Sequence, residues 1–164
     1  AAAEASGGES KVKRIYDSVR QLNVALRALE TSGKPVAAAV NGLALGGGLE
    51  IVLACHYRVL SDNPKLVLGL PEVLVGLLPG AGGTQRLPRL VAPEAAIAMM
   101  TSGKTVAAAK APTGLVDRIA DADPVEAAIA FLRDEAPPVR STGATKIRRT
   151  TISTMPSTRC ASSS

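Results

Sequence analysis

Two glutamates of this 164-residue chain lie in sequence settings that could support acid–base chemistry. Glu50 follows the triple glycine at 46–48 and opens an apolar segment that ends near Ala54, and Glu72 directly follows Pro71 after another apolar stretch. Carboxylates that meet beside backbone N–H groups can transfer a proton next to a carbonyl, while the N–H groups stabilise its developing negative charge. Acyl chemistry is therefore the leading hypothesis.

The glycines at 46–48 favour this chemistry by their position. Backbone N–H groups at the start of a helix lie at the positive end of its dipole, and glycine has no Cβ to block a ligand. A tight strand-to-helix turn would explain the triplet equally well, and both interpretations stay open. Neither these glycines nor those at 80, 82 and 83 match G-x-G-x-x-G or a P-loop, so nucleotide binding is the weakest alternative.

The apolar neighbours of both glutamates strengthen the functional interpretation. A glutamate in the first turn of a helix usually does no more than stabilise the dipole. Here the surrounding helix is apolar on every face, which predicts burial, and a buried ionisable group needs a reason. His56, the only histidine, is expected to be structural, and Arg86 and Arg89 to be solvated or to cap a helix.

Helical and extended patterns alternate along the chain, which predicts an α/β fold. The wholly apolar segment 36–40 is typical of a strand buried on both faces. The predicted helices cover residues 10–31 (amphipathic), 46–54, from 84 onward, 93–100 and 124–133, and the predicted strands cover 36–40, 57–60, 65–70 and 115–119.

Composition narrows the class of protein. The length predicts one domain, and 46% apolar with only 2% aromatic residues predicts an aliphatic core. No stretch approaches the roughly 18 apolar residues of a membrane span, and the first residues do not read as a secretory leader. Cys55 and Cys160 form neither a disulfide framework nor a metal-ligand spacing, so we expect no metal site and a cytoplasmic location.

The net charge of +5 comes mostly from the last segment. Residues 141–164 hold four of the 19 basic residues and no acidic one, and twelve of these 24 residues are Ser or Thr. We therefore expect a disordered or foreign basic tail at 141–164, and no nucleic-acid partner.

Two segments carry a resemblance to a known family. Residues 34–61 (KPVAAAVNGLALGGGLEIVLACHYRVLS) and 68–90 (LGLPEVLVGLLPGAGGTQRLPRL) resemble the crotonase, or enoyl-CoA hydratase/isomerase, superfamily. They are especially similar to the hydratase part of bacterial multifunctional fatty-acid oxidation enzymes, in which an NAD-dependent 3-hydroxyacyl-CoA dehydrogenase follows. The resemblance implies a crotonase-type spiral of ββα units in a partial domain over residues 10–140.

The resemblance also implies an activity and the residues behind it. In that scheme Glu50 and Glu72 add water across the C2–C3 bond of a 2-enoyl-CoA, giving 3-hydroxyacyl-CoA in fatty-acid β-oxidation. Glu72 exchanges the proton at C2, Glu50 activates the water, and the N–H of Gly47 contributes to the oxyanion hole. The implied substrate-binding residues are Leu70, Pro71, Pro79 and Gly80.

The departures from the family pattern bear on completeness and partners. An upstream Ala-Gly-Ala-Asp-type loop supplies the family's first oxyanion donor, and residues 1–33 lack it, so we expect a fragment without the N-terminal part of the core. Coenzyme A enters only as part of the substrate, NAD belongs to the dehydrogenase part, and no cofactor is expected in this segment. The parent enzyme would bring an oligomer or a thiolase partner. The alternatives are a Δ3-Δ2-enoyl-CoA isomerase and a non-catalytic crotonase-fold remnant.

Overall fold

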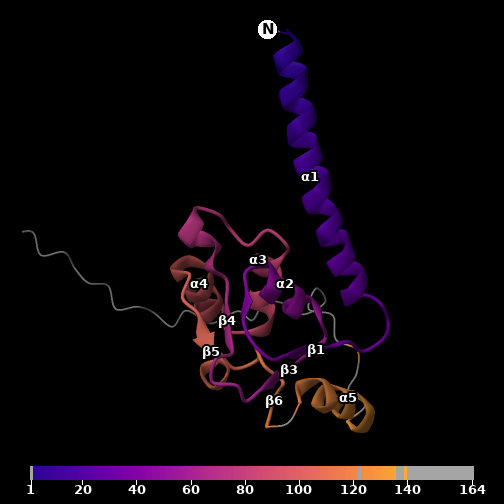
Figure 1. Cartoon of the computed structure of the whole chain (residues 1–164), viewed down its shortest axis with the longest axis vertical. Coiled ribbons are helices and arrows are strands. Elements are labelled where there is room, and N and C mark those ends of the chain that lie inside the picture. The colour runs from indigo at the N-terminus through magenta and orange to yellow at the C-terminus, as the bar shows by residue number, and fades with distance from the viewer. Residues whose placement is uncertain (1, 122, 136–138, 140–164) are drawn as a thin grey trace, which may run out of the picture.

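The computed structural model describes residues 2–121, 123–135 and 139, with side chains from residue 11 onward, so the predicted tail at 141–164 lies outside the described residues. Helices and strands alternate, which confirms the predicted α/β class (Figure 1). The helices are α1 (Ala2–Glu30), α2 (Gly47–Ala54), α3 (Gly83–Leu90), α4 (Pro93–Ser102) and α5 (Pro124–Asp134), with short 3-10 turns η1 (Pro71–Val75) and η2 (Ala108–Lys110). The strands are β1 (Ala37–Val40), β2 (Ala44–Leu45), β3 (Tyr57–Ser61), β4 (Val67–Gly69), β5 (Val106–Ala107) and β6 (Arg118–Ala120).

The strands form two small sheets, and a unit of two strands followed by a helix is repeated along the chain. One sheet has the order β1-β3-β6 and the other β2-β4-β5. β1 pairs in parallel with β3, and β2 pairs in parallel with β4, so each pair of consecutive strands gives one strand to each sheet. α2 follows the first pair and α3 follows the second, after η1. This is the spiral of ββα units that the resemblance implied.

The core between these units is aliphatic, as the composition predicted. β3 is the central strand of its sheet, and all five of its residues are buried. α5 is fixed to this sheet through Phe131, whose ring packs edge-on against Tyr57 with the ring centroids 5.3 Å apart. The main cluster of buried side chains includes Leu49, Leu53, Leu60, Leu68, Leu70, Leu87 and Leu115.

Two strand predictions need correction. Residues 36–40 are not buried on both faces, because Ala39 is exposed and residues 36–38 are only half-buried. The strand expected at 115–119 begins only at Arg118. A hydrogen bond of 3.0 Å from the N–H of Leu115 to the carbonyl of Pro112 closes a turn there and delays the strand.

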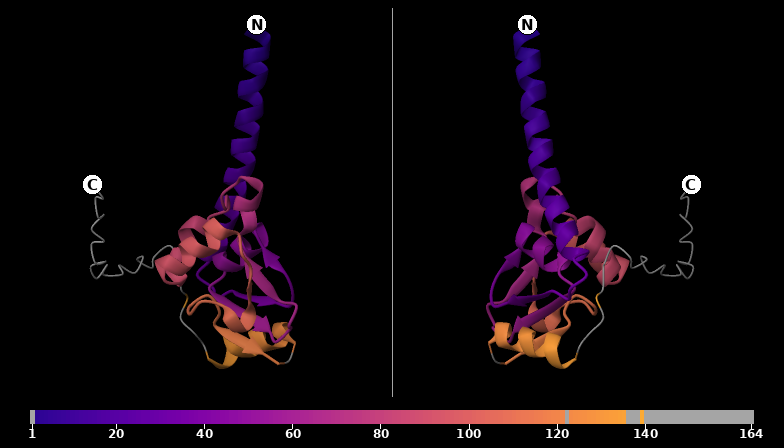
Figure 2. Two further views of the ribbon diagram at one scale, coloured as in Figure 1. Left: turned by 90° about the vertical axis from the view of Figure 1, so that its left-hand side faces the viewer. Right: turned by 90° about the vertical axis from the view of Figure 1, so that its right-hand side faces the viewer.

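α1 projects from the domain as a long rod, and only its last turns contact the other elements (Figures 1 and 2). The helix predicted at 10–31 is confirmed but starts earlier, at Ala2. Leu26 is the buried member of its apolar stripe, and Leu29 is half-buried. Within the described part of the chain, no helix has both the length and the apolar character needed to cross a membrane. The exposed stripe residues are Val12, Ile15, Val19 and Leu22.

Candidate active site

Glu50 is a buried carboxylate with fixed hydrogen-bond partners. It lies in the first turn of α2, and only 3% of the residue is exposed. Its Oε1 accepts hydrogen bonds from the backbone N–H of Ala81, at 2.8 Å, and of Gly83, at 2.7 Å. Hydrogen bonds from N–H groups to a carboxylate are among the stronger ones in proteins. The segment between Pro79 and Gly83 therefore holds one oxygen of Glu50 in place.

The close fit between Glu50 and this segment favours glycine at position 83. A Cβ on Gly83 would lie 3.0 Å from Oε1 of Glu50 and 3.0 Å from Cβ of Pro79. Both distances are tighter than ordinary van der Waals contacts, so a side chain at 83 would press directly on the carboxylate. Glycine in the second glycine-rich segment therefore lets the backbone approach Glu50 closely.

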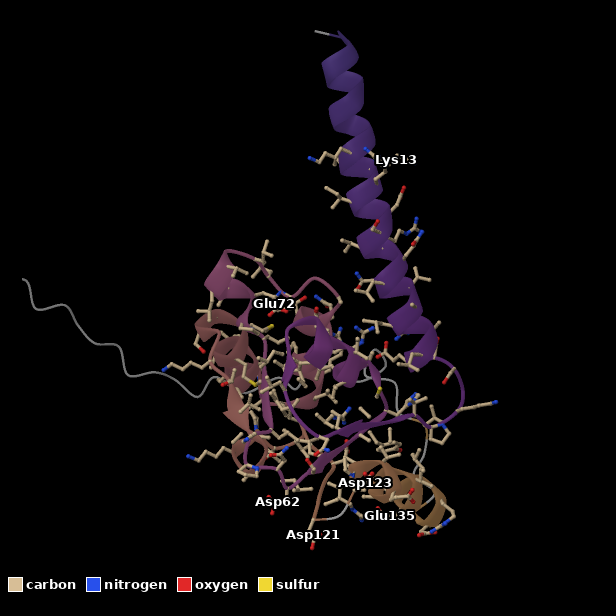
Figure 3. The ribbon with its side chains drawn as sticks, in the orientation of Figure 1. Lys13, Asp62, Glu72, Asp121, Asp123 and Glu135 are labelled. Atoms are coloured by element: carbon tan, nitrogen blue, oxygen red, sulfur yellow. The ribbon has the colours of Figure 1, made fainter. Side chains whose placement is uncertain are left out.

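Glu72 lies in η1, and its side chain packs against the start of α2. It lies in the first turn of η1, and its Oε1 is 3.2 Å from the place that a Cβ on Gly46 would occupy. The hydrogen bond from the N–H of Gly46 to the carbonyl of Gly69, 2.9 Å long, ties these segments together. Figure 3 shows Glu72 on the side of the domain from which α1 projects, far from the labelled acids Asp62, Asp121 and Glu135.

The second oxygen of Glu72 is buried and has no hydrogen-bond partner among the described residues. Buried polar atoms in native proteins are almost always paired, so such an atom points to water or a ligand at that place. The backbone of Glu50 also lies beside Gly46, because its N–H donates to the Gly46 carbonyl, at 3.0 Å, in the first turn of α2. That their carboxylates share one water remains a prediction.

Gly46 and Gly47 have different roles at the start of α2. Gly46 precedes the helix with φ of 54°, a left-handed value that favours glycine. Gly47 is the first helical residue, so its N–H has no partner within the helix. It is exposed, and a Cβ on it would meet nothing within 4 Å. The open space and unpaired position fit the predicted oxyanion donor, whose role remains a prediction.

The four predicted substrate-binding residues differ in accessibility. The side chain of Leu70 is fully buried in the core, Pro71 is half-buried, and Pro79 is buried beside Gly83. Gly80 is exposed, and its carbonyl accepts a hydrogen bond from Nδ2 of Asn23, at 3.1 Å. Their roles in binding remain predictions.

An exposed apolar surface connects Glu72 to the loop that binds Glu50. It lies between Glu72 and Pro79, and its four side chains are 63–74% exposed. Large apolar side chains that gather on a surface commonly mark a binding site. We call this the 74–78 surface, and it consists of Leu74, Val75, Leu77 and Leu78.

Arg86 is a residue whose role the sequence did not reveal. The expectation that it is solvated is wrong, because the residue is only 7% exposed, and its contacts are with a loop carbonyl and an acid of α1. Its Nη1 donates to the carbonyl of Ala81, at 2.9 Å, and its Nη2 lies 3.5 Å from Oε2 of Glu30. Arg89 is half-buried and donates to the carbonyl of Gln85 in its own helix. Arg86 follows Gly82 by four residues, and this spacing is the signal that could have predicted a contact between its side chain and the loop.

His56 and Cys55 are structural. The N–H of Val36 donates to Nδ1 of His56, at 3.1 Å, so Nε2 carries the proton and donates to the carbonyl of Glu30, at 3.0 Å. Burial raises the pKa of the Cys55 thiol, and the charge of Arg58 lowers it by a smaller amount. A thiol held in its neutral form is a poor nucleophile. Across the described residues, no group of three or more potential metal ligands occurs.

A ββα spiral with two glutamates around a glycine-rich helix start defines the crotonase class. The chain belongs to the enoyl-CoA hydratase/isomerase family, whose model matches residues 5–153. It resembles solved structures of the enoyl-CoA hydratase from Bacillus anthracis (36% identity, TM-score 0.70) and of DspI from Pseudomonas aeruginosa (38%, 0.70). Both comparisons cover 76% of this chain, and they cover 48% and 51% of the respective solved chains.

Curated relatives extend the comparison to longer proteins. The chain is 47% identical over 119 residues to the fatty acid oxidation complex subunit alpha of Idiomarina loihiensis. It is 58% identical over 93 residues to the protein of the same name from Shewanella loihica. These matches cover 72% and 56% of the chain, but only 15% and 13% of the relatives.

Proposed function

We propose that the chain carries the catalytic carboxylates of a 2-enoyl-CoA hydratase, which acts in fatty-acid β-oxidation as part of a multifunctional enzyme. The observation that supports this most directly is the buried Glu50 carboxylate, which two backbone N–H groups hold near the start of α2, while Oε1 of Glu72 lies against Gly46 at the same helix start. Hydration needs two carboxylates around one water, and an isomerase needs only one to move a proton. Family membership supports the acyl-CoA thioester as the substrate.

In the proposed reaction, water adds across the conjugated double bond. Glu50 takes a proton from the water as the water oxygen bonds to C3, and the π electrons move toward the thioester oxygen. The N–H of Gly47 stabilises the negative charge that develops there. Glu72 then gives a proton to C2, and solvent water returns both carboxyl groups to their starting states. No electrons are exchanged with the protein, so the chemistry requires no redox cofactor.

The surroundings of the glutamates suit these roles. Both hydrogen bonds to Glu50 use Oε1, which leaves Oε2 for the water. The buried Oε2 of Glu72 has no partner in the described part of the chain, which fits a group whose partner is a water or the substrate. The 74–78 surface offers apolar area to an acyl chain.

The relatives support a wider proposal about context. Because they are named as subunits of a fatty acid oxidation complex, we propose an oligomeric parent enzyme or a thiolase partner, and a cytoplasmic location. NAD would be used only by a dehydrogenase part of such an enzyme.

The test is hydration of a short 2-enoyl-CoA, followed by the loss of the conjugated thioester's absorbance. It is run on this chain and on a version extended to the length of a solved hydratase, since the chain matches about half of one. Replacing Glu50 or Glu72 with Gln should reduce kcat by about 10²–10⁴-fold. The matched control is Glu94→Gln, a first-turn glutamate of α4 that is exposed.

The alternatives give different results in the same assay. An isomerase would convert a 3-enoyl-CoA, and Glu50→Gln would spare that activity while Glu72→Gln abolished it. A non-catalytic remnant would show no turnover in either version, although the chain is folded. Unchanged hydration in both glutamate variants would contradict the proposed function.

A further inference from the structure

The position of Glu50 depends on what holds the loop that binds it. The loop between Pro79 and Gly83 donates both N–H groups that Oε1 accepts. Loops with several glycines are flexible unless other groups fix their backbone. Two side chains from outside the loop hold its carbonyls, namely Asn23 on Gly80 at 3.1 Å and Arg86 on Ala81 at 2.9 Å.

Asn23 acts on the same peptide group that Glu50 uses. The carbonyl of Gly80 and the N–H of Ala81 belong to one planar peptide unit, so fixing the oxygen also fixes the direction of the N–H. Nδ2 of Asn23 donates to this oxygen, and the N–H donates to Glu50 at 2.8 Å. One peptide therefore connects α1 to the carboxylate.

Arg86 holds the next peptide and lies across the loop. Its Nη1 occupies the space that a Cβ on Gly82 would need, and Gly82 has φ of 101°. The cation is balanced by Glu30, which is 3% exposed and also accepts a hydrogen bond from Arg27, at 2.7 Å. The charge of Arg86 is thus paired at the end of α1, where the chain is anchored to the domain.

From these contacts we infer that Arg86 is a positioning residue for Glu50, with Glu30 as its counter-ion and Asn23 as a second anchor. The inference rests on the proposed function only for its effect on turnover. When Arg86 is lost, the loop keeps its sequence but loses one of its fixed carbonyls. The Ala81 and Gly83 N–H groups then hold Glu50 less firmly, and its free oxygen is displaced from the water that it activates.

The first measurement does not depend on catalysis. Hydrogen exchange of the Ala81 and Gly83 amides is followed by NMR in the full chain and in Arg86→Met. Losing a hydrogen bond of ordinary strength should speed exchange at these two amides by about 2–10-fold. Amides of β3 should keep their rates. Arg86→Lys retains the charge and should restore part of the protection.

The second measurement separates kcat from KM for enoyl-CoA hydration. Arg86→Met should lower kcat by up to about 10²-fold, the scale for an ångström of misplacement, and leave KM within about twofold. Asn23→Ala should act in the same direction. The matched control is Arg89→Met, in the same helix one turn later, because Arg89 donates to its own helix. It should change neither exchange nor kcat.

Each outcome decides the inference. Unchanged exchange at Ala81 and Gly83 in Arg86→Met, or a rise that β3 amides share equally, would overturn it. If Arg86→Met does not fold, Asn23→Ala provides the exchange test on the other anchor, because it removes the hydrogen bond to the Gly80 carbonyl and should speed exchange at Ala81. Faster exchange at the two amides, together with no hydratase activity in either this chain or the extended version, would support the positioning role and contradict the proposed function.

Discussion

The N–H of Gly83 donates to Oε1 of Glu50 over 2.7 Å, at a place where a Cβ on residue 83 would lie only 3.0 Å from that oxygen. A glycine that appears in the sequence as part of a turn is therefore in direct contact with the proposed catalytic carboxylate. Cβ of Pro79 borders the same place from the other side, also 3.0 Å from a Cβ on Gly83.

Gly83→Ala should reduce hydration more than it reduces stability. Alanine improves the first turn of α3 by about 1 kcal/mol, which opposes an overpacking cost of roughly 1–3 kcal/mol. The added Cβ pushes on Glu50, so we expect kcat to fall about tenfold or more, given roughly 10²-fold per ångström of misplacement. Urea unfolding and steady-state kinetics check this. Gly42→Ala is the control, because its Cβ would meet nothing within 4 Å.

Arg58→Met should destabilise the fold without involving the site. Arg58 is 1% exposed, and its Nη2 lies 2.7 Å from Oδ2 of Asp117, which joins β3 to the segment before β6. Breaking a buried pair typically costs about 3–5 kcal/mol. Arg118→Met removes an exposed pair with Glu135 and should cost about 1 kcal/mol. If urea unfolding shows that Arg58→Met and Arg118→Met lose the same free energy of unfolding, the stronger role given to the buried pair is contradicted.

Much of the fold could be predicted because its signals are local. Glycine or proline marks the start of α2, α3, α4 and α5, and the strand predicted at 57–60 matches β3. Strands of two residues, such as β2 and β5, have no periodic pattern and could not be seen. The predicted strand at 65–70 shortens to β4 for a related reason. The N–H of Leu66 bonds to the carbonyl of Asn63, at 2.8 Å, and completes a turn.

The site was predictable only in part. Two glutamates in apolar segments suggested burial, and the structure buries Glu50 and the unpaired oxygen of Glu72. The ion pair of Glu30 with Arg86 joins residues that are 56 positions apart, and neither residue lies in a pattern that indicates the other. Such pairs are set by how α1 meets α3. That geometry belongs to the tertiary structure and not to any local sequence signal.

Stability should fall as pH rises above the ordinary pKa of cysteine, in part because of Cys55. Burial raises the pKa of this thiol above 9.0, the usual value, in the folded chain. The unfolded chain therefore loses the proton first, and unfolding becomes more favourable as pH increases from about 9 toward the folded-state pKa. Cys55→Ala should flatten the dependence of the unfolding free energy on pH in this range. An unchanged slope would show that other groups cause it.

The oxyanion role of Gly47 can be tested by removing its N–H without removing the helix. Proline is well tolerated at the first position of a helix, and a Cβ at Gly47 meets nothing within 4 Å. Gly47→Pro should therefore stay folded but lose about 10²–10³-fold in kcat, the usual effect of losing one oxyanion donor.

Gly47→Ala is the matched control for Gly47→Pro, since it adds bulk at the same place and keeps the donor. Its kcat should stay close to that of the unchanged chain. If the alanine and proline variants lose activity equally, the space in front of Gly47 matters for binding and its N–H does not stabilise the thioester oxygen. If the proline variant keeps full activity with an intact fold, the donor must lie elsewhere.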